Sequence, residues 1–246
     1  MTTRSRSSVG FTAITLAFLA IGCNSGDSTT PSQNVGSISG TVIFSGTTGS
    51  PQAPSVSTVR NDCTAKIHLD ESLLVDSESL GVKNAVIKII NMEDAAKPRE
   101  RDFLRALQHR NCRFEPHVLI VAAGREFSIL NWDGIFHNAH TTSSTNQPFD
   151  RGQPGSLKRV PITLENSETI EIACHAHEWS KAWVVVAEHR FYTITGERGE
   201  FRLDGVPPGS HELEIWHETL GTQKVKFSVQ PGKETQVDFE YSRPAG

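Results

Sequence analysis

Short apolar segments separated by turn residues run through most of this chain, and they limit the folds that are open to it. Within them, apolar and polar residues alternate or Val and Ile follow one another, and Gly, Pro, Asn or Asp stand between them. Such patterns are typical of β-strands that bury one or both faces. The segments are Ile38–Phe44, Val82–Ile90, Phe114–Val121, Glu126–Asn131, Thr169–Cys174 and Ala182–Ala187. Many short strands with almost no helix predict an all-β fold built from sandwiches.

One segment has a helical pattern. Pro98 stands where the first turn of a Pro98–His109 helix would lie, and Phe103 and Leu107 are four residues apart. This spacing places two side chains on one face of a helix. The helix would be short, so we expect it at the periphery of the fold.

The N-terminus has the pattern of a secretory signal. Arg4 and Arg6 precede the apolar segment Phe11–Ile21, and Cys23 follows it closely. The apolar segment is too short to span a bilayer. The residues before Cys23 resemble a bacterial lipobox, in which the cysteine is lipidated and the chain is cut before it, although Ala20 stands where leucine is usual.

This resemblance implies that residues 1–22 are a lipoprotein signal peptide and that Cys23 carries a lipid. The protein would then be anchored in the cell envelope of a bacterium, in the periplasm or at the cell surface. An ordinary signal, cut a few residues further on, is the alternative. Residues 23–35 include a stretch rich in Ser and Thr without apolar periodicity, so they are predicted to be a flexible tether.

The charge balance argues against nucleic acid as a partner. Removing Arg4 and Arg6 with the signal leaves 22 of the 24 basic residues against 28 acidic ones, a net charge of −6. No basic stripe is present in the mature sequence, so a phosphate backbone would meet no complementary surface. A mildly acidic protein is suited to solubility, or to docking against a basic patch on a redox partner protein.

The four cysteines divide among three roles in an exported protein. Cys23 takes the lipid and Cys174 is a metal-ligand candidate, which leaves Cys63 and Cys112 as a predicted disulfide in an oxidising compartment. In the chain-entropy model, closing a loop of about 50 residues stabilises the fold by about 4 kcal/mol. A metal-binding role for Cys63 or Cys112 is the weaker alternative, because neither has a histidine or cysteine at close loop spacing.

The loop that contains Cys174 and His177 carries the most specific chemistry in the sequence. A thiolate and an imidazole lie three residues apart there, and His137 offers a second imidazole from a distant loop. Two imidazoles and one thiolate form the His₂Cys set that binds copper in blue-copper proteins. The pattern therefore predicts a site for one copper ion and a role in electron transfer.

The residues around these ligands resemble the plastocyanin and amicyanin group of cupredoxins. The matching pattern is Phe114-x-Pro116-x-x-Leu119-x-Val121-x-x-Gly124, Asn131-x-Asp133, His137-Asn138 and Cys174-x-x-His177-x-x-Ser180, followed by Val184-Val185-Val186. The resemblance implies a Greek-key sandwich over residues 82–188, with His137, Cys174 and His177 as equatorial copper ligands. We also expect Asn138 to join the two metal-binding loops through hydrogen bonds.

The sequence departs from this family at the axial position. Ser180 stands where the family has methionine, and Met92, the one methionine of the mature sequence, is far from the loop. His140 and His175 are further candidate ligands of a modified site. Because neighbouring residues of a strand point to opposite faces, we expect His175 to turn away from a metal bound by Cys174. We expect His140 at the surface or beside the ligands.

Residues 189–246 carry a second β pattern. The motifs Gly199-x-Phe201-x-Leu203 and Val206-Pro207-Pro208-Gly209 resemble carboxypeptidase regulatory-like domains, which are small transthyretin-like sandwiches. Residues 36–42 resemble the beginning of such a domain, and residues 36–81 are predicted to be an N-terminal β segment. Two arrangements stay open: the copper domain and the regulatory-like domain follow in series, or the copper domain is inserted in the other.

These patterns favour a lipid-anchored mononuclear copper protein that passes single electrons between partner proteins. The chain lacks a nucleophile elbow, a phosphate-binding loop and a paired-carboxylate motif, so we expect no enzymatic activity of its own. Copper storage or delivery without redox turnover is a second hypothesis, which the missing methionine and the additional histidines favour slightly. A metal-free surface module built from β-sandwiches is the third.

Overall fold

All regular secondary structure in the described part of the chain is β-strand. The computed structural model describes residues 1, 34–46, 63, 70–92, 97–99 and 101–242. Residues 2–22 of the predicted signal peptide, Cys23 and most of the tether lie outside these residues. The described residues form strands and no helix, which confirms the predicted all-β class.

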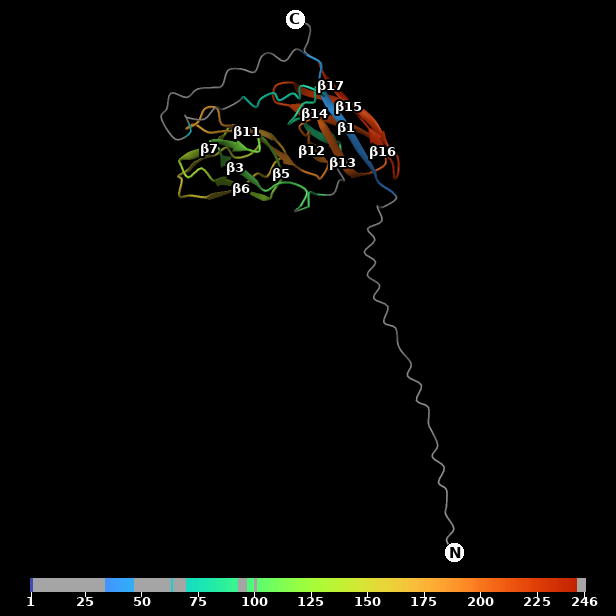
Figure 1. Cartoon of the computed structure of the whole chain (residues 1–246), viewed down its shortest axis with the longest axis horizontal. Helices are drawn as coiled ribbons and strands as arrows, with labels where there is room; N and C mark the ends of the chain where they lie inside the picture. The colour runs from blue at the N-terminus through green and yellow to red at the C-terminus, as the bar shows by residue number, and fades with distance from the viewer. Residues whose placement is uncertain (2–33, 47–62, 64–69, 93–96, 100, 243–246) are drawn as a thin grey trace. The chain divides into compact units, whose positions relative to one another are not determined.

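Two β-sandwiches make up the described chain (Figure 1). The first, called the terminal sandwich, consists of β1 (Gly36–Phe44), β2 (Val86–Ile90), β12 (Tyr192–Ile194), β13 (Glu200–Val206), β14 (Gly209–His217), β15 (Gly221–Val229), β16 (Glu234–Gln236) and β17 (Phe239–Tyr241). The second, called the central sandwich, consists of β3 (Ala106–Arg110), β4 (Arg113–Glu115), β5 (Val118–Ala122), β6 (Glu126–Asn131), β7 (His137–Thr141), β8 (Asp150–Gln153), β9 (Arg159–Thr163), β10 (Thr169–Ala173) and β11 (Lys181–Ala187).

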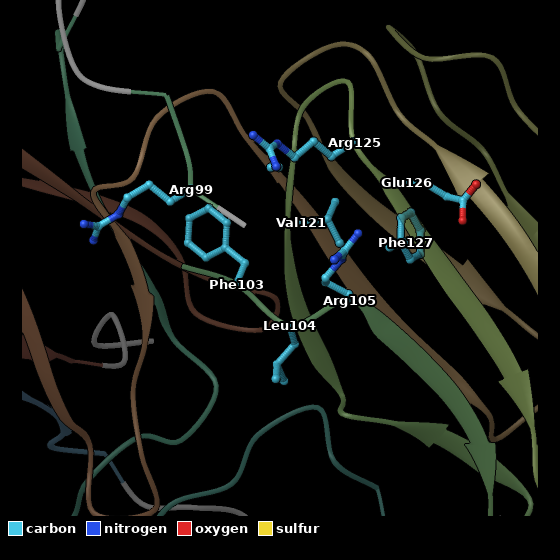
Figure 2. A pocket seen from close by; sticks show the side chains of 9 residues that line it. Arg99, Phe103, Leu104, Arg105, Val121, Arg125, Glu126 and Phe127 are labelled. Atoms are coloured by element: carbon cyan, nitrogen blue, oxygen red, sulfur yellow. The ribbon is translucent and has the colours of Figure 1, made fainter. Parts of the chain in front are cut away.

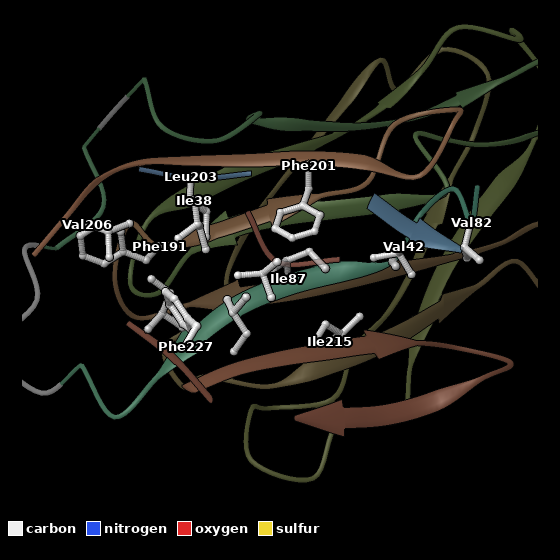
Figure 3. Packing of buried hydrophobic residues seen from close by; sticks show 14 of the residues in the cluster. Ile38, Val42, Val82, Ile87, Phe191, Phe201, Leu203, Val206, Ile215 and Phe227 are labelled. Carbon is white, nitrogen blue, oxygen red and sulfur yellow. The ribbon is translucent and has the colours of Figure 1, made fainter. Parts of the chain in front are cut away.

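The terminal sandwich joins strands from both ends of the described chain. Strand β1 pairs antiparallel with β13 and parallel with β16 and β17, and the facing sheet has the order β12-β2-β14-β15. Apolar side chains from the two sheets meet in one core, to which Ile38, Ile87 and Ile215 contribute (Figure 3). Alternate residues of β1 are buried in this core, as expected for a strand with one covered face.

The central sandwich is inserted between β2 and β12 of the terminal sandwich. The predicted boundary at residue 82 is therefore wrong, because Val86–Ile90, expected in the copper domain, pairs with β12 and β14. The predicted boundary at residue 189 lies between β11 and β12. Residues 36–81 likewise do not form a separate segment, because β1 completes the sheet that contains β13. The apolar pattern of Val86–Ile90 predicted burial correctly but did not show which core would bury it.

The central sandwich has two sheets, with strand orders β5-β11-β10-β7-β8 and β4-β3-β6-β9. Its core contains Phe114, Leu119, Ile129, Ile172 and Val184 among other buried residues. Strands β5 and β11 pair in parallel, and both carry long apolar runs. Cys174 belongs to this core, so the metal-ligand candidate lies at the edge of tightly packed apolar residues.

The predicted helix at Pro98–His109 is wrong. Its second half is strand β3, which pairs with β4 and β6 and buries Leu107 and His109 on one face. Residues four apart lie on the same face of a helix and also on the same face of a strand. The spacing of Phe103 and Leu107 therefore could not distinguish a helix from a strand. Strand pairing across the sheet decided the conformation.

Candidate metal centre

Cys174 and His177 lie in a tightly folded loop between β10 and β11. The backbone N–H of His177 donates to the carbonyl of Cys174 at 3.1 Å, and the N–H of Ser180 donates to the carbonyl of His177 at 2.8 Å. The N–H of Cys174 donates in turn to the carbonyl of Ser180 at 3.0 Å, which closes the loop. These bonds fix the backbone on both sides of the thiol and the imidazole.

The structure brings the three predicted ligands together. His137 begins β7, which pairs with β10, and this pairing places its ring beside the Cys174 loop. The Cys174 sulfur lies 3.9 Å from Nδ1 of His137 and 3.5 Å from Nδ1 of His177. The exposed fractions of His137, Cys174 and His177 are 0%, 2% and 1%. The cluster is therefore buried, and all three donor atoms face one another.

The donor atoms have the spacing that one bound metal ion requires. Metal bonds of about 2.0 Å to nitrogen and 2.3 Å to sulfur, at trigonal or tetrahedral angles, place nitrogen and sulfur about 3.5–3.8 Å apart. The sulfur–nitrogen distance to His177, 3.5 Å, lies within this range, and the distance to His137, 3.9 Å, is slightly above it. One soft thiolate and two imidazoles form a donor set suited to copper. The residues present thus fit a copper ion without a rearrangement of the loops.

Asp133 orients the His137 ring. Its Oδ2 accepts a hydrogen bond from Nε2 of His137 at 3.0 Å, so the proton resides on Nε2 and the lone pair of Nδ1 faces the sulfur. Burial lowers the pKa of His137, although the Asp133 carboxylate opposes this effect. The imidazole is therefore neutral at neutral pH, which is the state that binds a metal.

Asn138 joins the His137 and Cys174 loops, as the sequence predicted. Its backbone N–H donates to the Cys174 sulfur at 3.4 Å, and its side-chain oxygen accepts from the backbone N–H of His175 at 2.6 Å. Burial raises the pKa of the Cys174 thiol, while the N–H groups of Asn138, Ala176 and His177 lower it. Because burial has the larger effect, the free side chain is a thiol, and metal binding must displace its proton.

The residues near the predicted axial position offer no thioether. Met92 packs against the core of the terminal sandwich, away from the cluster. Ser180 is buried, and its hydroxyl has no hydrogen-bond partner among the described residues. The described residues thus supply no axial thioether to the three candidate donors.

His109 is a neighbour of the cluster that the sequence did not indicate. Its ring stacks on that of His137, with centroids 4.2 Å apart and planes at 11°. It is fully buried, and within the described part of the chain neither ring nitrogen has a hydrogen-bond partner. Burial, followed by the neighbouring His137 and His177, lowers the pKa of His109 to about 3. The sequence pattern that could have indicated His109 is the alternation along β3, which places Leu107 and His109 on the same buried face.

His140 and His175 lie together outside this cluster. Their ring centroids are 4.4 Å apart, and both rings lie beside Asp150 of β8. His175 is exposed, in agreement with the expectation that it turns away from the Cys174 sulfur. Neither histidine belongs to the buried group of three donors.

The predicted disulfide is present and contacts the centre. Cys63 and Cys112 are bonded, and the backbone N–H of Cys112 donates to Oδ2 of Asp133 at 2.9 Å. The indole N–H of Trp179 donates to the carbonyl of Cys112 at 2.8 Å. The disulfide therefore holds a backbone segment whose two polar groups bind residues beside the metal-ligand candidates.

A cavity elsewhere in the central sandwich has no part in this site. It has a volume of about 20 Å³, room for about one water molecule. Its lining, drawn in Figure 2, consists of Arg99, Phe103, Leu104, Arg105, Val121, Ala122, Arg125, Glu126 and Phe127. Two of the charges are already paired, Arg99 with Asp102 and Glu126 with Arg159.

Among the described residues, no helix has the length and apolar character needed to cross a bilayer.

Comparison with known proteins gives one family match and several partial structural likenesses. Residues 179–242 match the model of the carboxypeptidase regulatory-like domain, which confirms that resemblance for this part of the chain. No curated protein matches the chain. The matched range includes β11 of the central sandwich and leaves out β1 and β2, which complete the terminal sandwich.

Among solved structures, the chain is similar to a copper-containing nitrite reductase from Thermus scotoductus SA-01, with 22% identity and a TM-score of 0.32. That match covers 34% of this chain and 22% of the reductase. A purple cupredoxin from Nitrosopumilus maritimus has 16% identity and a TM-score of 0.30, over 34% of this chain and 100% of its own. A methionine-to-alanine mutant of amicyanin in the Cu(I) form has 15% identity and a TM-score of 0.31. This match covers 41% of the present chain and 98% of the amicyanin chain.

Proposed function

We propose that this protein is an exported, lipid-anchored mononuclear copper protein that carries single electrons between partner proteins. The observation that supports the proposal is the buried convergence of His137, Cys174 and His177, whose donor atoms all lie within 4.8 Å of one another. Cys23 would carry the lipid, and the cell envelope of a bacterium would be the location. Neither nucleic acid binding nor an enzymatic activity forms part of the proposal.

Bound copper would supply a one-electron couple between Cu(I) and Cu(II). The protein would contribute a donor set that is arranged before the metal binds: Asp133 fixes the His137 ring, and the N–H of Asn138 donates to the sulfur. Loop hydrogen bonds fix Cys174 and His177 relative to each other. A rigid site changes little between the two oxidation states, which favours rapid electron transfer.

Apolar side chains beside the centre suit a redox partner. Trp132 and Phe136 precede His137, and their exposed fractions are 61% and 54%. Large aromatic side chains are common at the centre of protein interfaces. Docking there would bring a partner protein close to the His137 loop.

Copper storage or delivery without redox turnover is the second candidate. It is favoured by the Ser180 hydroxyl, which stands where the cupredoxin pattern has methionine. A metal-free surface module is the remaining alternative, and it gives no role to a buried thiol between two imidazoles.

The visible spectrum and voltammetry of the purified chain, loaded with one equivalent of copper, test the proposal. We expect an intense thiolate-to-copper charge-transfer band and reversible one-electron behaviour, because a single thiolate is bound. Cys174→Ala should abolish the band, while His211→Ala, a histidine change in the terminal sandwich, should leave it unchanged. Copper that is bound loosely without the band would favour handling, and a chain that binds no copper would favour the metal-free module.

A further inference from the structure

Three polar side chains form a second group of potential metal ligands at the surface of the central sandwich. They are His140 of β7, Asp150 of β8 and His175 of the loop after β10, and their donor atoms lie within 4.8 Å of one another. His140 is the cross-strand partner of Asp150 on one side and of Ala173 on the other. Strand pairing therefore fixes His140 and Asp150 relative to each other, while His175 follows shortly after Ala173, the other strand partner of His140.

The distances within this group are those of shared metal ligands rather than hydrogen bonds. Oδ2 of Asp150 lies 3.8 Å from Nδ1 of His140 and 3.7 Å from Nδ1 of His175. Both distances exceed the range of a hydrogen bond to nitrogen. Two metal–ligand bonds of about 2.1 Å, at angles from tetrahedral to somewhat wider than trigonal, place their donor atoms about 3.4–3.8 Å apart.

One nitrogen of the group has no hydrogen-bond partner among the described residues. Nδ1 of His140 is buried, and it makes no hydrogen bond within the described residues. A buried polar atom without a hydrogen bond costs free energy, so such atoms usually have a ligand, an ion or water. Here the atom lies beside a carboxylate oxygen and a second imidazole, which a cation would bridge.

The carboxylate is held in place by a residue that also contacts the buried centre. The side-chain N–H of Asn138 donates to Oδ1 of Asp150 at 2.6 Å, which leaves Oδ2 to the two histidines. The side-chain oxygen of Asn138 accepts from the backbone N–H of His175. Hydrogen bonds that orient a ligand in this way are characteristic of metal sites.

We propose that His140, Asp150 and His175 form a second metal site that binds one divalent transition-metal ion, either Cu²⁺ or Zn²⁺. Two neutral imidazoles and one carboxylate carry a single negative charge, which suits a divalent cation. Imidazole nitrogen favours zinc and copper, and Cu²⁺ binds such donors most tightly among the divalent first-row ions. The half-exposed position leaves further coordination positions open to water.

This site is separate from the proposed thiolate centre, and it does not depend on copper at Cys174. Its occupancy would nevertheless affect that centre if both are filled. Asn138 contacts both Asp150 and the Cys174 sulfur, and His175 follows Cys174 directly in the chain. A divalent cation at the second site would place positive charge close to the thiolate.

Metal titration of the Cys174→Ala chain tests the site without the thiolate. We expect one Zn²⁺ per chain by equilibrium dialysis, and one Cu²⁺ with nitrogen couplings in its electron paramagnetic resonance spectrum. Adding His140→Ala and His175→Ala should weaken Zn²⁺ binding by more than about 10-fold. Changes of residues that only support metal ligands already weaken metal affinity by about 10-fold or more, and here the ligands themselves are removed. His211→Ala in the same background is the matched control and should change nothing.

Equal Zn²⁺ affinity with and without His140 and His175 would overturn the proposal. The group would then be a set of contacts between two imidazoles and a carboxylate, and not a metal site. If Cys174→Ala does not fold, the wild-type chain is first loaded with one equivalent of Cu⁺ to occupy the thiolate, and the same Zn²⁺ titration is then carried out. There Asp150→Asn should weaken Zn²⁺ binding, and an unchanged affinity would again contradict the site. A missing thiolate band in copper-loaded wild type would count against the proposed function alone.

Discussion

Asp133 connects the candidate ligand His137 with the disulfide through a single oxygen atom. Its Oδ2 accepts hydrogen bonds from Nε2 of His137 and from the backbone N–H of Cys112. The carboxylate therefore selects the His137 tautomer that presents Nδ1 to the sulfur. This role explains in physical terms why an acidic residue close to the first histidine belongs with the metal-ligand pattern.

His109 makes the stability of the metal-free protein depend on pH. Its pKa is lowered to about 3 from an ordinary 6.5, so the folded state binds its proton less readily than the unfolded state. Stability is therefore full above pH 6.5 and is lost as the pH falls toward 3. Between pH 6.5 and pH 4.5, the free energy of unfolding should therefore fall by about 2 kcal/mol less in His109→Phe than in the wild-type chain. Urea unfolding of the metal-free chain at both pH values measures it.

The matched control for this prediction is Gln108→Leu, a change in the same strand that removes no titratable group. It should leave the difference in unfolding free energy between the two pH values unchanged. If His109→Phe also left that difference unchanged, His109 would not be a buried neutral histidine.

At the scale of residues, the sequence indicated the three buried donors but not all of their neighbours. Cys174 and His177 could be recognised because a thiol and an imidazole at this spacing have few other uses together. His109 was missed because its segment was interpreted with helical periodicity. Asp150 was missed because an isolated aspartate in a loop-rich segment has no local signal, and only the pairing of β7 with β8 places it beside His140.

Glu168 anchors the connection between β7 and β8 to the start of β10. Its carboxylate accepts hydrogen bonds from the hydroxyl of Ser143, the backbone N–H of Ser144 and the side chain of Asn146. Burial raises the pKa of Glu168, but the hydrogen bonds have the larger combined effect and hold the pKa well below its usual range. The ionised form thus stabilises a connection that leads into the Asp150 strand.

We predict that Glu168→Gln lowers the free energy of unfolding by about 1–2 kcal/mol at pH 7, since the hydrogen bonds lose their charged acceptor. Because the pKa is depressed in the folded state, this stabilisation is present above pH 4.5 and declines as the pH falls below it. Urea unfolding at pH 7 and pH 3 checks both statements. The control is Glu171→Gln, which affects only an exposed pair with Lys181 and should cost less than about 0.5 kcal/mol. Equal effects of the two changes would contradict the assignment.

At the scale of elements, strands with clear alternation or long apolar runs were predicted well. Glu126–Asn131 and Ala182–Ala187 correspond to β6 and β11 within one residue. Phe114–Val121 is instead two strands, β4 and β5, separated by residues that include Pro116, which has no N–H to donate to a sheet. Local patterns thus predicted where strands exist, while their partners depend on contacts distant in sequence.

At the scale of the molecule, the insertion places residues of both sandwiches in contact. Val86 and Tyr192 of the terminal sandwich share a small apolar cluster with Val118, Ile120 and Val185 of the central one. The Glu218 carboxylate accepts a hydrogen bond from the indole of Trp183 and contacts His117. Two chain crossings and these contacts join the domains, whereas domains in series would share a single linker. Sequence patterns alone left both arrangements open because they do not show which strands pair.

Copper K-edge X-ray absorption of the chain, loaded with one equivalent of Cu⁺, tests most directly whether His137, Cys174 and His177 bind one ion together. The account predicts one sulfur scatterer at about 2.2–2.3 Å and two nitrogen scatterers at about 2.0 Å, as for other protein thiolate and imidazole ligands. The sulfur scatterer should disappear in Cys174→Ser. A wild-type spectrum with nitrogen and oxygen neighbours alone would contradict the account.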